Sequence, residues 1–189
     1  MCQCLEIALI ARGRPWGNNA RREQPGEKDQ DMSWVLGAGE HSFAELMAVR
    51  PNLAAGVAAF SDLLWCAPGI DPVTLELCRL RVAQLHGARA ALAERRPEAF
   101  AAGLTEERIA RLADYGRDPG FSARERACLE LSELFVMDPS AIDDACFVAV
   151  RDALGEPGTV ALLEALAVFD GFSRAQVMLD ASPAAEALA

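Results

Sequence analysis

Glu76 and His86 are the side chains of this sequence best suited to moving a proton near neutral pH. Glu76 could accept a proton in a pocket, or it could pair with Arg79 along the helix surface at i, i+3 spacing. His86 could act as a general base, or it could bind a terminal carbonyl of the helix that it ends. For both residues the spacing favours the structural interpretation.

Two arginines offer a different chemistry, the recognition of an anion. Arg89 and Arg95 lie six residues apart on a predicted helix, and their guanidinium groups could bind a carboxylate-bearing ligand. Solvent-exposed arginines need no ligand to explain them, so the alternative is a plain surface role.

The cysteines do not form a recognisable site. Cys78 follows Glu76 by two residues, which places the two side chains on nearly opposite faces of a helix. Six are too few for a disulfide framework in a chain of this length, and without an export signal we expect them to be reduced in a cytoplasmic protein. Cys2 and Cys4 have no second pair and no nearby histidine, so we expect no metal site. The other three lie in apolar helical patterns typical of small buried hydrophobes: Cys66, Cys128 and Cys146.

These residues must be positioned by helices, because apolar residues recur with helical spacing from His41 onward and Pro and Gly punctuate the segments. Asp71 and Pro72 supply an N-cap and a first-turn proline, and Ser122 with Glu125 forms a capping box. The fold class is therefore all-α, with helices predicted near 41–49, 52–66, 72–86, 88–101, 105–114, 122–135, 140–154 and 160–179.

The chain divides by composition into three parts. Residues 1–31 carry five basic and five acidic residues, so the formal net charge of −10 arises entirely downstream. We predict a leader at 1–31 that is disordered or precedes the true start at Met32, a helical domain at 32–180 and a flexible tail at 181–189. The acidic balance argues against nucleic acid as a partner, and no apolar run is long enough to span a membrane.

The segment 71–109, DPVTLELCRLRVAQLHGARAALAERRPEAFAAGLTEERI, resembles the core of the carboxymuconolactone decarboxylase and alkylhydroperoxidase D-like (AhpD-like) family, and 121–135 continues the resemblance. Peroxidase-type members carry a Glu, a CxxC pair, a His and a Gly-hydrophobic-Ser/Thr-x-Glu turn. In this register Glu76 holds the glutamate position and 103–107 the turn. The two cysteine positions are Ala88 and Ala91, and the histidine position is Arg95. The resemblance implies an AhpD-like multi-helical bundle.

The resemblance also implies what chemistry has been lost. Alanine cannot attack a peroxide or form a disulfide, and a guanidinium cannot exchange a proton near neutral pH. The lactone decarboxylases of the family do not use the cysteine pair, but they too carry a His where Arg95 stands. We expect either altered small-molecule chemistry or a non-catalytic binding or scaffold protein, without a cofactor. The family also implies a homo-oligomer, a trimer or hexamer.

A pocket would separate these two functions. An enclosed cavity containing Glu76 and His86 would support an enzyme, whereas a site filled by Leu92 and Phe100 would support a scaffold.

Overall fold

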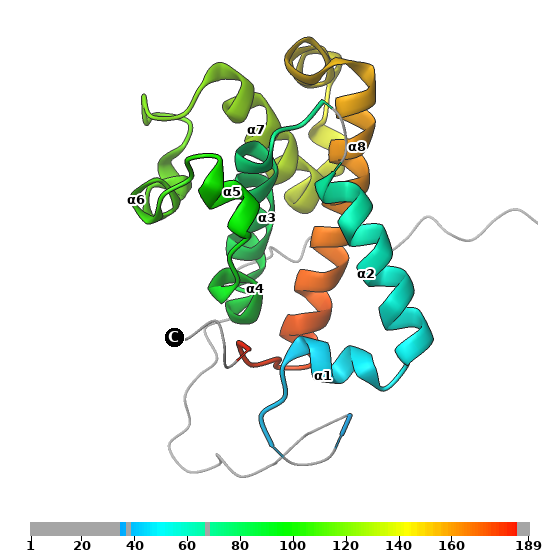
Figure 1. The fold of residues 1–189 in the computed structure, drawn as a ribbon. Helices are drawn as coiled ribbons and strands as arrows, with labels where there is room; N and C mark the ends of the chain where they lie inside the picture. The colour runs from blue at the N-terminus through cyan, green and yellow to red at the C-terminus, as the bar shows by residue number, and fades with distance from the viewer. Residues whose placement is uncertain (1–34, 37–38, 67–68, 185–189) are drawn as a thin grey trace, which may run out of the picture. The chain divides into compact units, whose positions relative to one another are not determined.

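The computed structural model describes residues 35–36, 39–66 and 69–184 (Figure 1). These residues form helices and contain no strand, which confirms the predicted all-α fold class. The leader predicted at 1–31 and residues 185–189 of the predicted tail lie outside the described residues. The elements are α1 (Phe43–Ala48), α2 (Pro51–Trp65), α3 (Pro72–His86), α4 (Arg89–Ala93), α5 (Pro97–Ala101), α6 (Glu106–Ala110), η1 (Leu112–Asp114), α7 (Ala123–Met137), η2 (Pro139–Ala141) and α8 (Asp144–Met178).

Helix α3 begins and ends as the sequence predicts. The Asp71 side chain accepts a hydrogen bond from the Thr74 backbone N–H at 2.9 Å, and Pro72 occupies the first turn, where its missing N–H costs nothing. Gly87 ends the helix with a φ of 66°, a left-handed conformation that glycine adopts without strain. His86 is therefore the last residue of α3, and its side chain projects from the end of a rigid element.

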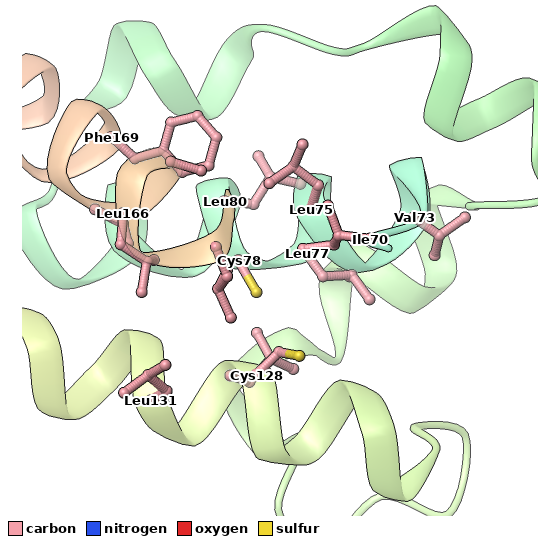
Figure 2. Close-up of a cluster of buried hydrophobic side chains, with 14 of the residues drawn as sticks. Ile70, Val73, Leu75, Leu77, Cys78, Leu80, Cys128, Leu131, Leu166 and Phe169 are labelled. Carbon is pink, nitrogen blue, oxygen red and sulfur yellow. The ribbon is translucent and has the colours of Figure 1, made fainter. Parts of the chain in front are cut away.

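Helix α3 is the centre of the core and packs against both α7 and α8. Its apolar residues are buried around the whole circumference, among them Leu75, Leu77 and Leu80 at 1 % exposure or less. Figure 2 shows Leu77 and Cys78 on the side of α3 that faces α7, where Cys128 and Leu131 lie, and Leu75 and Leu80 on the opposite side. Burying a leucine side chain contributes about 2 kcal/mol. The all-round apolar pattern of 73–85 thus reflects packing within one chain.

The single helix predicted at 88–101 is wrong: the chain forms two short helices, α4 and α5, separated by residues 94–96. Pro97 begins α5, and a proline disfavours helical backbone in the residue before it. Arg96 has an extended conformation there, as does Glu94 at the end of α4. The break brings residues 94 and 96 alongside the neighbouring helices rather than on a continuous helical surface.

The two helices predicted at 140–154 and 160–179 meet at a sharp bend inside α8. Gly155 has a φ of 71° and interrupts the helical backbone two residues before Pro157. Beyond the bend, Gly158 lies against Gly69, where a Cβ on Gly158 would lie 3.0 Å from the Gly69 carbonyl oxygen. The absence of a side chain at position 158 therefore permits the second half of α8 to approach this loop.

The described part of the predicted tail is held by the domain. Ala181 is buried, and the Ser182 N–H donates to the His41 carbonyl at 2.9 Å. Among the described residues, no helix is both long enough and apolar enough to cross a membrane.

Candidate functional site

Glu76 and Arg79 form a buried ion pair on α3. Arg79 Nε donates to one Glu76 carboxylate oxygen and Nη2 to the other, both at 2.7 Å. Glu76 is fully buried and Arg79 is 7 % exposed, so the expectation of a pair on the helix surface is wrong. The i, i+3 spacing correctly predicted Arg79 as the partner of Glu76. The sequence does not show that the pair is buried, because a helix that is apolar on all sides has no polar face to mark its exposed surface. Both oxygens of Glu76 are therefore occupied.

Arg79 also ends helix α4. Its Nη1 donates to the Ala91 carbonyl at 2.8 Å and its Nη2 to the Glu94 carbonyl at 2.9 Å. The last carbonyls of a helix have no partner within the helix, and a buried guanidinium supplies one. One side chain thus neutralises Glu76 and fixes the backbone at which the chain leaves α4.

Ala88 and Ala91 lie at the start and in the middle of α4, and the Ala91 carbonyl accepts a hydrogen bond from Arg79. Ala88 is 1 % exposed and Ala91 is 6 % exposed, and both pack with Ala83 of α3. They carry no group that could react. Ala91 also lines the cavity described below.

His86 contacts an acidic residue of α8 instead of a terminal carbonyl of α3. Its Nε2 lies 2.6 Å from Asp170 Oδ1, and Arg174 Nε donates to the same carboxylate at 2.9 Å. Burial by itself raises the pKa of Asp170, but the hydrogen bonds from Arg174 and His86 outweigh it and hold that pKa below its ordinary value. Because the carboxylate is ionised, His86 Nε2 is the donor in this contact.

The structure separates Arg89 from Arg95. Arg89 is largely exposed and lies 3.5 Å from Asp180, itself exposed. Arg95 donates to both carboxylate oxygens of Glu106, at 2.7 and 3.1 Å, and this hydrogen bonding holds the pKa of Glu106 below its ordinary value. Neither arginine lines the cavity described below, and Arg95 already has a carboxylate partner.

The described cysteines are free thiols in different surroundings. Figure 2 shows Cys78 of α3 and Cys128 of α7 inside the apolar cluster. Burial raises the pKa of the Cys128 thiol to about 12 and also raises the pKa of Cys78, so neither is a thiolate near neutral pH. Burial also raises the pKa of Cys146, whereas Cys66 is exposed.

A cavity of about 80 Å³ opens next to Arg79. Neither Glu76 nor His86 lines it, and Leu92 and Phe100 pack against the core, so it matches neither predicted pocket. Its wall comes from four helices and the loop between α4 and α5: Ser61, Arg79, Ala91, Glu94, Arg96, Val168, Phe169, Phe172, Ser173 and Gln176.

Two of the cavity residues, Arg96 and Gln176, were not predicted from the sequence as site residues. The Arg96 guanidinium stacks over the Trp65 ring at 4.7 Å from its centroid. Gln176 is 6 % exposed, and its Oε1 is buried without a hydrogen-bond partner among the described residues. Nothing in the helical periodicity of 160–179 marks Gln176, because its significance depends on helices far away in the sequence.

Comparisons with known proteins agree with this fold. The model of the carboxymuconolactone decarboxylase family matches residues 51–133. The uncharacterized protein YdfG of Bacillus subtilis (strain 168) is 29 % identical over 111 residues, which are 58 % of this chain and 76 % of YdfG.

Solved structures extend the similarity in fold beyond the residues that the family model matches. A protein of unknown function from Agrobacterium tumefaciens, proposed to be the antioxidant defence protein AhpD, superposes with a TM-score of 0.65 at 18 % identity, over 73 % of this chain and 94 % of that one. The debrominase Bmp8 superposes with a TM-score of 0.66 at 13 % identity, over 77 % of this chain and 78 % of Bmp8. A cysteine-to-alanine variant of Bmp8 in complex with 2,3,4-tribromopyrrole gives 0.64 at 14 % identity, with the same coverage. At these identities the similarity concerns the fold.

Proposed function

We propose that this chain, whose residues 51–133 match the model of the carboxymuconolactone decarboxylase family and whose fold is AhpD-like, binds a small molecule in the cavity beside Arg79 and lacks thiol redox chemistry. The observation that carries this proposal is the buried ion pair. Both oxygens of Glu76 accept hydrogen bonds from Arg79, so the carboxylate is held in this pair, and Glu76 does not line the cavity.

The residues around the pair support the same proposal. In the register of the resemblance, Ala88 and Ala91 replace the two redox cysteines, and alanine can neither attack a peroxide nor form a disulfide. Cys78 and Cys128 do not replace them, because their raised pKa values keep both thiols protonated. A ligand bound in the cavity would therefore not meet a reactive thiolate from these residues.

A peroxide-reduction assay with a dithiol reductant and an organic hydroperoxide tests the absence of thiol chemistry. We expect no turnover above the protein-free rate, either in the wild type or in a variant with all six cysteines replaced by alanine. Turnover in the wild type that is lost in the cysteine-free variant would show that a remaining thiol has taken over the reaction, and the proposal would fail.

A homo-oligomer, a trimer or hexamer as the resemblance implies, is a second proposal, with a scaffold role as the alternative function. It is supported by α2, where Leu53, Phe60 and Leu63 are 57 %, 42 % and 70 % exposed. Their spacing places them on one face of the helix. A solvent-exposed apolar stripe of this kind is typical of a surface covered by a partner subunit.

A further inference from the structure

We propose, on the basis of the small-molecule function proposed above, that the cavity beside Arg79 selects an uncharged ligand whose polar end both donates and accepts a hydrogen bond, with a primary carboxamide as the best match. The cavity requires a small polar end, a donor, an acceptor and no net charge. A different observation supports each requirement.

The size of the cavity limits the ligand to a few non-hydrogen atoms. A water molecule needs at least about 10–15 Å³ of such space, so a cavity of about 80 Å³ has room for roughly five to eight groups of that size. Val168, Phe169 and Phe172 supply apolar surface on the α8 side. A short aliphatic body with a single polar end therefore fits, either alone or as the end of a larger molecule.

Gln176 requires a donor from the ligand. Its Oε1 is buried and accepts no hydrogen bond from any described residue, although the residue lines the cavity. An acceptor left unsatisfied in the interior is costly, and a ligand N–H or O–H would remove that cost. The amide of Gln176 pairs well with a second amide, because each presents a donor and an acceptor side by side.

Arg79 offers the complementary donor. A guanidinium has five N–H bonds, and the carboxylate of Glu76 with the carbonyls of Ala91 and Glu94 account for four. The remaining N–H belongs to Nη1, and Arg79 lines the cavity. A ligand carbonyl oxygen can accept it.

The charges of the wall favour a neutral ligand. Glu76 neutralises Arg79 through two hydrogen bonds, and the other two charged residues of the lining, Glu94 and Arg96, have opposite signs. The wall therefore carries no net charge to offset the desolvation of an anion. This distinguishes the cavity from the carboxylate site expected at Arg89 and Arg95.

Three probes of nearly identical size and shape test the proposal: propionamide, butanone and propionate. Only propionamide is uncharged and both donates and accepts. We expect NMR titrations of the full chain to show propionamide binding about tenfold more tightly than butanone, which lacks the donor, and more tightly than propionate, which is charged. The expected chemical-shift changes lie at Ala91 and Ser173, which line the cavity.

Gln176→Leu removes the acceptor and keeps the apolar bulk, so the variant should fold at least as well as the wild type. In this variant we expect the preference for propionamide over butanone to disappear. Gln84→Leu is the matched control, because Gln84 binds Arg81 at 3.0 Å and does not line the cavity, so the preference should remain.

Three results would overturn the inference: no binding of any probe, equal or tighter binding of butanone or propionate, or an unchanged preference in Gln176→Leu. Its failure can be distinguished from failure of the proposed function. Tight binding of butanone or propionate with shifts at Ala91 would leave a small-molecule cavity and overturn only the ligand class. Thiol-dependent peroxide turnover would overturn the proposed function.

Discussion

At the scale of single residues, Arg79 binds both the buried carboxylate of Glu76 and the backbone carbonyls at the end of α4. Its guanidinium neutralises a fully buried carboxylate and binds two carbonyls at the end of α4. A buried charge that loses its partner is far more costly than the pair is stabilising, because the remaining charge is left without either water or a counter-charge.

We therefore predict that Arg79→Met lowers the free energy of unfolding by about 3–5 kcal/mol. Adding Glu76→Leu to this variant should recover most of the loss, since the unpaired carboxylate is then gone. Urea denaturation followed by circular dichroism measures both values.

Arg89→Met provides the control, because Arg89 is largely exposed and its pairing with Asp180 is at the surface. Its effect should stay within about 0.5 kcal/mol. A loss in Arg79→Met no larger than that in Arg89→Met would show that the buried pair is not the main support of this region.

Part of this residue-level arrangement can be predicted from the sequence. The pairing of Glu76 with Arg79 follows from their spacing, because i, i+3 neighbours meet on any helix, whatever surrounds that helix. The burial of the pair and the roles of Arg96 and Gln176 do not follow from the sequence. Arg96 reaches the cavity through the break between α4 and α5, which Pro97 marks locally, and Gln176 reaches it through the packing of α8, which has no local signature.

At the scale of elements, the contact between His86 and Asp170 ties the end of α3 to α8, with Arg174 as a second donor. The pKa of Asp170 is lower in the folded chain than its ordinary value of 3.8. A carboxyl group of this kind stabilises the fold above its unfolded pKa, and the contribution is lost as the pH falls through the folded pKa.

We therefore predict that Asp170→Asn destabilises the domain near pH 6 and that the difference from the wild type fades as the pH falls well below 3.8. The effect should stay below about 1 kcal/mol, because the group is partly exposed to solvent. Urea unfolding across this pH range provides the measurement.

Asp180→Asn is the control, since Asp180 is almost fully exposed and should give no such pH-dependent difference. A difference in Asp170→Asn that stays constant from neutral to acid pH would argue that the carboxylate is not the group responsible.

The elements themselves were largely predictable, because their ends carry local chemistry. The capping box of Ser122 and Glu125 begins α7, and Gly87 ends α3, as expected. The break at 94–96 was not expected, although Pro97 stood in the sequence. The alanine-rich run before it favoured a continuous helix, whereas the folded chain stabilises the break through Arg79, twelve or more residues earlier.

At the scale of the whole molecule, the apolar surface of α3 is covered within one chain, so it gives no reason to expect a partner subunit. The exposed apolar stripe on α2, formed by Leu53, Phe60 and Leu63, is a better reason to expect a partner subunit. Figure 1 shows α2 lying along α8 at the edge of the described helices, away from α7.

We predict that the wild-type protein elutes as a trimer or hexamer and that Leu63→Asp lowers its mass toward that of a 20.3 kDa monomer. A charge placed in an apolar interface is left unpaired there, so association weakens. Size-exclusion chromatography with light scattering measures the mass.

Met137→Asp is a matched control, because Met137 at the end of α7 is also 70 % exposed but lies outside the stripe. It should leave the mass unchanged. A wild type that is already monomeric, or equal effects of the two variants, would refute the assignment of α2 as the interface.

The contact of Arg79 with Glu76 also limits which redox reactions could be engineered into the domain. Cysteines introduced at positions 88 and 91 would supply sulfur, yet the nearby carboxylate would remain bound through both oxygens by the guanidinium. A carboxylate free of the guanidinium would therefore need a third change, at position 79, which by itself leaves a buried charge unpaired. Any such design passes through a destabilised variant.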